Sequence, residues 1–442
     1  MQKYVSAVVG VVVFLCATFT RAQQLAFPGA EGYGRFALGG RGGKALFVTN
    51  LNDKGPGSLR SAIEAQGPRI VIFKVSGTIE LQSNLRIEHP RITIAGQTAP
   101  GDGICLRKYP LIISADDSVV RYIRVRLGDE ADNKVDGIDV SDAENVIVDH
   151  CSVSWTLDEA VNTYHGTKNV TLQWCLISES LHNSRLQQGH GFAASLGGIN
   201  TSYHHNLLAN NAGRNPSIAG EKSNPTINLD FRNNVVFNWQ YRTLDGRPCS
   251  INVVNNYYKA GPASRKDSRI VKIQCLEDGS FGRWYIQGNV FEDRSQSRRR
   301  NDLIRIDASN ISIESAMINE PADFAPILTQ TAEEAFENVL LYAGAIRPKR
   351  DSHDERIVRE VRSGRTTFGN GIIASQTDVG GWPELSSTQP QQDIDADGMS
   401  DEWERRFSPN GDLSLQSSQD LDNDGYTNVE EYLNQTNPLK NE

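Results

Sequence analysis

The sequence has 442 residues, of which 38% are hydrophobic and 22% charged, with 45 lysines and arginines against 54 aspartates and glutamates. This composition excludes collagen, a coiled coil, a wholly disordered chain and a polytopic membrane protein, and the length allows one large domain and a smaller one. Residues 393–442 hold 13 acidic and 3 basic residues, a net charge of −10, so residues 1–392 sum to +1. A neutral body with an acidic tail argues against nucleic acid as a partner.

The first 22 residues have the pattern of a secretory signal peptide. Lys3 gives a positive start, an apolar run extends from Val8 to Phe19, and the triplet ending at Ala22 matches a cleavage site. The apolar run is short for a membrane span, and no other run is long enough to cross a bilayer. We therefore expect a secreted, extracellular protein, located in the periplasm or at the cell surface if the host is bacterial.

Cysteines and sequons add little to this expectation. Five cysteines follow the signal segment: Cys105, Cys151, Cys175, Cys249 and Cys275. An odd number in so long a chain does not indicate a disulfide scaffold, although a single bridge remains open. The glycosylation sequon occurs at Asn169, Asn200, Asn310 and Asn434, which predicts a glycoprotein only if the host is eukaryotic.

Short β-branched runs recur through the middle of the chain, each ending at a polar or small pivot followed by an apolar pair. The pivots are Cys151, Cys175, Asn206, Asn234, Asn256 and Asn289, at steps of 24, 31, 28, 22 and 33 residues. Such steps, with almost no helical periodicity between them, are typical of a solenoid of stacked strands. Asparagine at one corner of successive turns can hydrogen-bond along the stack and tolerates the left-handed backbone of a sharp bend. A β-sandwich is the alternative, but irregular steps around a fixed local pattern favour a parallel β-helix.

Beyond the predicted solenoid domain of residues 23–318, the pattern changes. In the segment 319–368, Thr331 and Glu334 form a capping box that opens an apolar helical run ending at Gly344, and residues 354–362 are predicted as a second short helix. Residues 369–392 are rich in Gly, Ser, Thr, Pro and Gln, which predicts a linker.

Two loops in residues 393–436 each place oxygen ligands at positions 1, 3, 5, 9 and 12 around a glycine at position 6. The first loop has Asp393, Asp395, Asp397, Asp401 and Glu404, and the second has Asp420, Asp422, Asp424, Asn428 and Glu431. Alternating carboxylates around a glycine turn, closed by a bidentate glutamate, form a cage for Ca²⁺. Helix-forming residues follow each loop, so the tail resembles an EF-hand or dockerin-like pair with a structural role.

Several motifs follow one another in residues 26–295. They include 26–34, the glycine-rich 39–43, 75–79, 94–101, 146–150, 152–155 and 214–216. Together they resemble polysaccharide lyase family 1, the pectate lyases. The resemblance implies an all-β fold, a right-handed parallel β-helix, in agreement with the repeat. It also implies a secreted enzyme that cleaves α-1,4-polygalacturonate, the pectin backbone, by Ca²⁺-assisted β-elimination to 4,5-unsaturated oligogalacturonides, and we expect a monomer.

In this reaction a base removes the proton on C5 of a uronate, and the site must stabilise the enolate-like charge that develops. The resemblance places the catalytic arginine at Arg214, although arginine is by its pKa a poor base and a carboxylate clamp is its alternative role. The family often has a second arginine five residues later, where this chain has Ala219, and Lys222 is the expected substitute. The region in which family lysines bind uronate holds His182, Arg185 and His190.

The resemblance also implies a groove Ca²⁺, a Lewis acid for this reaction. Its family ligands fall on Asp136, Asp158 and Asn162. A further family aspartate falls on Lys134, so one ligand is missing or is supplied by Asp132 or Glu159. A weaker site, or one formed only with substrate, is expected.

Two histidine motifs are predicted to be structural. Asp149 and His150 lie at a pivot, where a buried, hydrogen-bonded histidine is expected. His204 and His205 resemble a metal-binding pair, but adjacent residues on a strand face opposite sides, so packing within the stack is favoured.

Two other functions compete with the lyase. A polygalacturonase-type hydrolase needs close carboxylates, and Gly189-His-Gly191 resembles that family, but the Asp116–Asp117 pair is far from it in sequence. A non-catalytic pectin-binding β-helix would keep the stack and the calcium tail while losing Arg214 and the acidic cluster. Product spectra separate hydrolysis from elimination, since only elimination leaves an ultraviolet-absorbing C4=C5 double bond.

Overall fold

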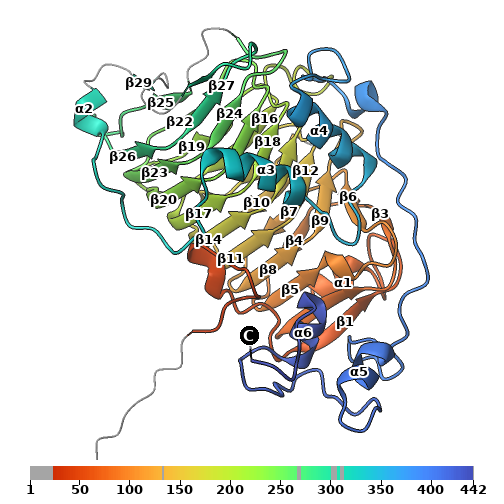
Figure 1. Ribbon diagram of the computed structural model, residues 1–442. Helices are drawn as coiled ribbons and strands as arrows, with labels where there is room; N and C mark the ends of the chain where they lie inside the picture. Colours follow the sequence, from red (N-terminus) through yellow and green to blue (C-terminus); the bar gives the residue numbers. More distant parts are fainter. Residues whose placement is uncertain (1–22, 132–133, 266–269, 300–305, 309–312, 442) are drawn as a thin grey trace, which may run out of the picture.

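The computed structural model describes residues 23–131, 134–265, 270–299, 306–308 and 313–441. The expected signal peptide, Asp132 and the sequon at Asn310 lie outside the described residues. Up to Ala308 the chain winds through three sheets, which form the right-handed parallel β-helix that the repeat predicted (Figure 1).

From β2 onward each turn of the solenoid contributes a strand to each sheet, while β1 extends the first sheet alone and β28 pairs antiparallel with β27. The first sheet contains, in spatial order, β1 (Lys44–Val48), β2 (Arg69–Phe73), β5 (Ile92–Ala95), β8 (Ser118–Arg121), β11 (Glu144–Asp149), β14 (Lys168–Gln173), β17 (Ile199–His204), β20 (Ile227–Arg232), β23 (Ser250–Val254) and β26 (Arg283–Gln287). The second contains β3 (Gly77–Glu80), β6 (Ile104–Arg107), β9 (Ile123–Arg126), β12 (Ser152–Ser154), β15 (Leu176–Ser178), β18 (Leu207–Ala209), β21 (Val235–Phe237), β24 (Tyr257–Lys259), β27 (Val290–Glu292) and β28 (Arg298–Arg299). The third contains β4 (Leu85–Ile87), β7 (Leu111–Ile113), β10 (Ile138–Val140), β13 (Glu159–Asn162), β16 (Phe192–Leu196), β19 (Ser217–Ile218), β22 (Leu244–Gly246), β25 (Val271–Ile273) and β29 (Ile306–Ala308).

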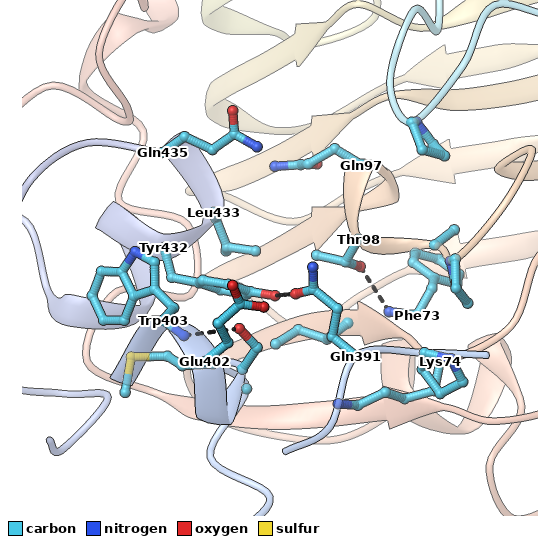
Figure 2. Close-up of a pocket in the computed structure, with 18 of the residues that line it drawn as sticks. Phe73, Lys74, Gln97, Thr98, Gln391, Glu402, Trp403, Tyr432, Leu433 and Gln435 are labelled. Carbon is cyan, nitrogen blue, oxygen red and sulfur yellow. Dashed lines mark hydrogen bonds between the residues drawn. The ribbon is translucent and has the colours of Figure 1, made fainter. Parts of the chain in front are cut away.

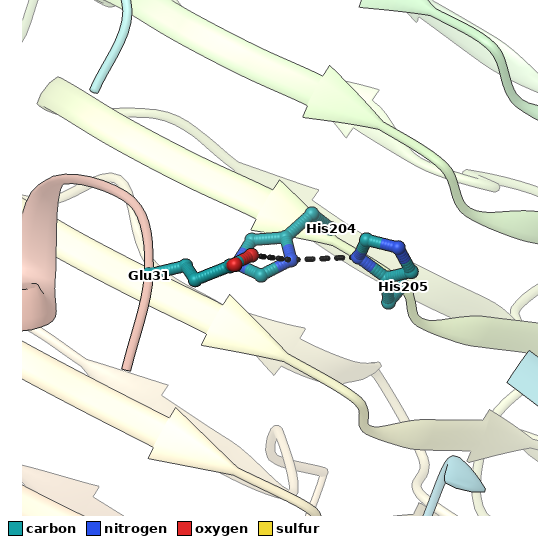
Figure 3. Close-up of side chains that lie close together, drawn as sticks. All are labelled: Glu31, His204 and His205. Atoms are coloured by element: carbon teal, nitrogen blue, oxygen red, sulfur yellow. Dashed lines mark hydrogen bonds and ion pairs between the residues drawn. The ribbon is translucent and has the colours of Figure 1, made fainter. Parts of the chain in front are cut away.

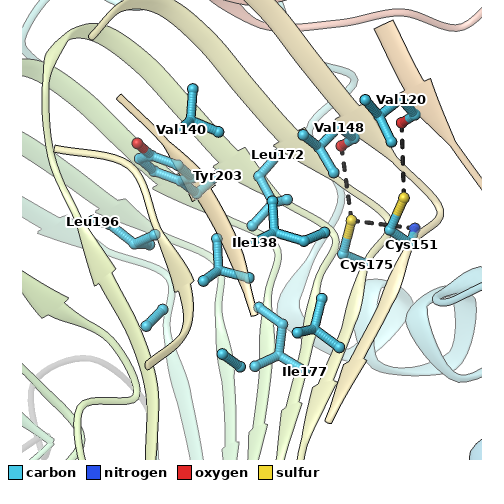
Figure 4. Close-up of a cluster of buried hydrophobic side chains, with 14 of the residues drawn as sticks. Val120, Ile138, Val140, Val148, Cys151, Leu172, Cys175, Ile177, Leu196 and Tyr203 are labelled. Atoms are coloured by element: carbon cyan, nitrogen blue, oxygen red, sulfur yellow. Dashed lines mark hydrogen bonds between the residues drawn. The ribbon is translucent and has the colours of Figure 1, made fainter. Parts of the chain in front are cut away.

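Parallel pairing places residues of like character in register, and these fill the interior of the solenoid. Val148, Leu172, Tyr203 and Phe231 are successive partners across β11, β14, β17 and β20. All four are buried, and Figure 4 shows three of them within the core. A parallel sheet buries its strands and so favours near-continuous apolar runs, which is why these short β-branched segments form strands.

The single disulfide that the sequence left open is not formed: the five described cysteines are free. Cys151 and Cys175 occupy equivalent corners of successive turns, and their Sγ atoms face the backbone carbonyls of Val120 and Val148 at 3.7 Å each (Figure 4). Both cysteines are therefore small buried residues of the stack.

The expected asparagine ladder is confirmed. The Nδ2 atoms of Asn206, Asn234 and Asn256 each donate to the Oδ1 atom of the next ladder residue, at 3.0, 3.0 and 2.9 Å, and the ladder ends at Asn289. The left-handed backbone, however, lies one residue earlier, at His205, Asn233, Asn255 and Gly288. The bend thus precedes the ladder residue, whose amide is free to bond along the stack.

A second ladder occupies another corner and includes two of the sequons. Asn169 donates through Nδ2 to Asn145, Asn200 to Asn169, and Asn228 to Asn200, at 3.2, 3.5 and 3.1 Å. The Nδ2 atom of Asn434 donates to a helix carbonyl at 2.8 Å. A glycan attaches at Nδ2, so each of these three sequons uses its acceptor atom within the fold.

Short helices lie outside the three sheets of the solenoid. They are η1 (Tyr33–Phe36), α1 (Leu59–Ile63), η2 (Gly96–Thr98), α2 (Ile313–Ala316), α3 (Ala332–Tyr342), α4 (Ser352–Ser363), η4 (Gln376–Val379), α5 (Asp401–Phe407) and α6 (Asn428–Asn434). The capping box of Thr331 and Glu334 opens α3 as expected, and α4 extends the second predicted helix by a residue or two at each end. Among the described residues, no helix combines the length and apolar character needed to span a bilayer.

Helices α3 and α4 cover the second sheet, and polar side chains join them to it (Figure 1). Arg126 in β9 bonds to Asp354 of α4 at 2.8 Å, and Arg356 bonds to Glu179 at 2.7 Å. The Nε2 atom of His353 lies 3.2 Å from the Ser154 hydroxyl, and burial lowers the pKa of His353 well below its ordinary value. His353 is therefore a neutral imidazole inside this interface.

The predicted linker 369–392 is irregular apart from η4, and it lies along the body. The Gln376 side chain donates to Asp129 at 2.9 Å, and the Trp382 indole donates to a backbone carbonyl of β9 at 2.9 Å. The tail that follows packs on the β1 end of the first sheet, where Met399, Val429 and Leu433 contact Ile70 and Ile72. Ion pairs tie it further, Lys74 with Asp393 and Arg41 with Glu430, both at 2.9 Å. The tail is thus docked against the solenoid.

Candidate functional site

The third sheet brings the predicted groove residues together. Asp136 lies just before β10, Asp158 just before β13, and Glu159 and Asn162 at the two ends of β13. Arg214 lies just before β19. Because β10, β13, β16 and β19 are successive strands of the sheet, side chains 78 residues apart in sequence occupy one short stretch of its surface.

The acidic part of the site is a tight cluster. Carboxylate oxygens of Asp136, Asp158 and Glu159 lie within 4.8 Å of one another. Asp136 accepts from the Glu159 backbone N–H through Oδ1 and from Asn162 Nδ2 through Oδ2, both at 3.0 Å. Burial raises the pKa of Asp136 to about 7, against the hydrogen bond from Asn162, and the negative charge of Asp158 adds to the rise. The hydrogen bonds to Asp136 therefore do not offset the negative charge that the cluster gathers.

The donor set fits a hard cation. Each of the three carboxylates has an oxygen in the cluster, and the Oδ1 atom of Asn162 is buried with no hydrogen-bond partner among the described residues. Oxygen donors of this kind are those that Ca²⁺ prefers. Lys134, which replaces a family aspartate, is exposed, and Glu159 is the described carboxylate that completes the cluster.

Arg214 reaches into this cluster. Its backbone is left-handed, with φ of 50°, and its guanidinium contacts the Oε1 atom of Glu159. The guanidinium carbon lies 4.1 Å from the ring centroid of Phe192, close enough for a cation–π contact. Burial lowers the pKa of Arg214, and the positive charge of Arg242 lowers it further, against the opposing effect of Asp158. The site thus holds an arginine that loses its proton more readily than usual.

Arg242 is a site residue that sequence reasoning missed. It lies before β22, its Nε atom 3.4 Å from Oδ2 of Asp245, and its guanidinium carbon is 5.7 Å from the Phe192 centroid. A signal for it exists in the sequence: Arg242 follows Arg214 by 28 residues, the same interval as from Asn206 to Asn234. One turn of the solenoid therefore places the second cation directly beside the first.

The four predicted substrate contacts have different positions. His190 lies in the site, with Nε2 3.6 Å from Asp158, and His182 adjoins it by bonding through Nδ1 to the His190 carbonyl. Arg185 instead contacts Asp129, through the backbone carbonyl and through the carboxylate at 3.9 Å. Lys222 is exposed, and its backbone N–H donates to Glu277 at 3.3 Å. Arg242, and not Lys222, is thus the cation acting on Arg214.

The carboxylate pair considered for a hydrolase lies elsewhere. Asp116 and Asp117 precede β8 of the first sheet, where they accept backbone N–H groups from Glu144 and Leu38 at 2.8 and 3.1 Å. They hold loops together and are not part of the cluster on the third sheet.

The tail loops form two further acidic clusters. Asp393, Asp395 and Asp397 place carboxylate oxygens within 4.8 Å of one another, and Asp420, Asp422 and Asp424 do the same. Both oxygens of Glu404 and of Glu431 are buried without a hydrogen-bond partner among the described residues. Burial and then the neighbouring aspartates raise the pKa of Glu404 to about 7 and that of Glu431 to about 8. Buried carboxylates gathered in this way fit two hard cations.

A cavity of about 820 Å³ lies between the tail and the first turns of the solenoid. Figure 2 shows Trp403 and Tyr432 of the tail on one side and Gln97 and Thr98 of the body on the other. The Tyr432 hydroxyl donates to Gln391 at 2.7 Å. No residue lining this cavity belongs to the cluster on the third sheet, so the cavity is distinct from the candidate site.

Known proteins resemble the chain over almost its whole length. The probable pectate lyase C of Aspergillus fumigatus is 34% identical over 424 residues, and that of Aspergillus terreus 36% over 423, each alignment covering 94% of both chains. The crystal structure of the major allergen from cedar pollen has a TM-score of 0.51 at 16% identity, covering 71% of this chain and 92% of the allergen, which agrees with the fold. No protein-family model matches the chain.

Proposed function

This chain belongs to the pectate lyase family and is a lyase, and from this premise we propose that it cleaves α-1,4-polygalacturonate by β-elimination at the third sheet. The observation that carries the proposal is the contact of Arg214, whose pKa burial lowers, with Glu159, the buried member of a cluster of three carboxylates. Elimination needs a base beside a positive charge that stabilises the uronate carboxylate; Arg214 would supply the base, and the three carboxylates would hold the cation.

Arg214 is the base in this proposal. Burial and the adjacent positive charge of Arg242 favour its neutral form, and that form can accept the C5 proton of a bound uronate. Contact with Glu159 and stacking on Phe192 fix the direction of the guanidinium. After proton transfer, Arg214 is again a cation beside Glu159, the C4–O bond breaks as the C4=C5 double bond forms, and the departing oxygen takes a proton from water.

The uronate carboxylate is held by charge on both sides of Arg214. Asp136, Asp158, Glu159 and Asn162 would hold a Ca²⁺ ion, which supplies Lewis-acid stabilisation of the carboxylate when it is bound. Arg242 presents its guanidinium on the other side and can bind a carboxylate bidentately. It takes the role that the sequence assigned to Lys222.

The test is the rate of polygalacturonate cleavage with calcium and with an excess of chelator. We expect ultraviolet-absorbing unsaturated oligogalacturonides with calcium and little product without it. New reducing ends that form without ultraviolet absorbance would identify hydrolysis and overturn the proposal. Binding of pectate without either signal would identify a non-catalytic protein.

We further propose that the tail ions are structural and that the protein is exported. Support for the first comes from the buried carboxylates of both loops and from the docking of the tail on the β1 end of the first sheet. Support for the second is the sequence pattern of residues 1–22. The N-terminus of protein recovered from culture medium tests export: it should begin near residue 23, and intact, cell-retained protein would contradict the proposal.

A further inference from the structure

Two adjacent histidines and a glutamate converge on the first sheet, away from the groove (Figure 3). The Nδ1 atoms of His204 and His205 are 2.9 Å apart, and Oε2 of Glu31 is 3.9 Å from Nδ1 of His204. Adjacent strand residues were expected to face opposite sides, and that expectation was wrong here. His205 has a left-handed backbone, with φ of 54°, so the alternation of the strand ends at His204 and both rings turn toward each other.

Both imidazoles have the charge state and the fixed orientation that a metal ligand needs. Each is buried, and burial lowers the pKa of His204 well below its ordinary value and that of His205 to about 4. Each ring is therefore neutral at pH 7 and carries a nitrogen lone pair. Stacking of His205 on Trp174, with ring centroids 4.3 Å apart, fixes its orientation. The Nε2 atom of His204 has no hydrogen-bond partner among the described residues.

Glu31 is a partly buried carboxylate that no lysine or arginine of the described residues pairs with. Burial raises its pKa, and its Oε1 atom accepts a backbone N–H from Leu328 at 3.2 Å. The nearby cation Arg232 is already engaged by both oxygens of Asp230, at 2.9 and 3.1 Å. A partly buried carboxylate beside two neutral imidazoles would be stabilised by a metal ion, since charges removed from water in proteins are paired or coordinate metals.

We propose that Glu31, His204 and His205 form a binding site for a divalent transition-metal ion of the zinc class, separate from the calcium sites. Two imidazole nitrogens and one carboxylate suit zinc, whereas the groove and tail clusters offer only oxygen donors and suit calcium. Glu31 precedes η1, while His204 ends β17 and His205 follows it, so a bound ion would tie the N-terminal segment to the first sheet. Its expected effect is on stability, and catalysis at the third sheet does not depend on it.

The experiment uses the full-length protein, stripped of metals and returned to excess calcium so that the oxygen-only sites are filled. Co²⁺, which reports coordination through its visible absorption, and Zn²⁺ are then titrated in turn. We expect one equivalent to bind, with nitrogen-type Co²⁺ bands that Zn²⁺ displaces, and a higher Tm with Zn²⁺. Polygalacturonate cleavage should be the same with and without Zn²⁺, which separates this proposal from the proposed function.

Variants assign the binding to the cluster. Glu31→Gln changes little in shape at a partly exposed position, so the fold is retained, and we expect at least tenfold weaker binding and loss of the Tm increase. His165→Asn, which removes an exposed histidine outside the cluster, is the matched control and should behave as the wild type. Absence of bound Co²⁺ in the wild type, or equal binding by Glu31→Gln, would overturn the proposal.

Discussion

Replacement of Arg214 by lysine keeps a positive charge in the groove but removes the planar guanidinium. In the structure that guanidinium contacts Oε1 of Glu159 and lies 4.1 Å from the Phe192 centroid. An ammonium on a flexible stem reproduces neither this direction of contact nor the stacking, so it cannot hold a lone pair in the direction of the C5 proton. A positioned general base contributes about 10²- to 10⁴-fold to a rate, or about 3–5 kcal/mol of barrier. We therefore expect kcat of Arg214→Lys to fall by that factor.

Stability and substrate affinity should change much less. The lost stacking involves a side chain that is 33% exposed, and such contacts contribute about 0.5–1 kcal/mol. The lysine still offers a charge to Glu159, and Arg242 and the carboxylate cluster remain to hold uronate. We expect a KM within about threefold of wild type and a Tm lower by only a few degrees.

The assay measures initial rates of unsaturated product against polygalacturonate concentration at saturating calcium. Arg185→Lys is the matched control, since Arg185 contacts Asp129 and not the cluster, and its kcat should stay near that of the wild type. A folded Arg214→Lys enzyme with a near wild-type kcat would refute the reasoning. A raised KM with unchanged kcat would show instead that Arg214 is a carboxylate clamp.

Three other perturbations test the remaining features. Arg242→Ala should raise KM for oligogalacturonides about tenfold with a smaller change in kcat, because it removes one contact to a substrate carboxylate, worth about 1.4 kcal/mol. A loss in kcat alone would instead assign Arg242 to the chemical step. Combined Glu404→Gln and Glu431→Gln should abolish the tail's calcium-dependent stabilisation, about 2.7 kcal/mol for each ion at a hundredfold excess over Kd, and with it the rise in Tm. Cleavage should stay calcium-dependent; loss of that dependence would contradict separate sites. A histidine has a pKa near 6.5 in an unfolded chain, whereas His353 stays neutral in the folded protein. The stability of the wild type should therefore fall as pH drops below 6.5, and His353 accounts for at most about 1.4 kcal/mol of that loss per pH unit. Urea unfolding measured at several pH values should show that the unfolding free energy of His353→Gln depends less steeply on pH than that of the wild type. An unchanged dependence on pH would exclude this role for the imidazole.

The sequence by itself determined the stacked strands, the asparagine ladder and the helix after Thr331, because each depends on residues that are close in the chain or recur once in every turn. β-Branched runs at steps of 22–33 residues specify stacked strands, since each run pairs with its equivalent in the next turn. The ladder from Asn206 to Asn289 follows for the same reason, because one residue type recurs at one corner. The helix that follows Thr331 depends on a capping box within four residues. Each signal is local, or repeats in step with the fold.

Only the tertiary structure decided which side chains meet across turns. The approach of Arg214 to Glu159 depends on the lengths of the connections between strands, which follow no period. The meeting of His204 with His205 depends on one left-handed residue that reverses the alternation of a strand. Docking of the tail likewise depends on the apolar face that β1 and β2 leave open at the end of the stack. Strand pattern specifies the scaffold, whereas loop length and single backbone torsions set the distances between its charged groups, and for that reason the chemistry of the site appears only in three dimensions.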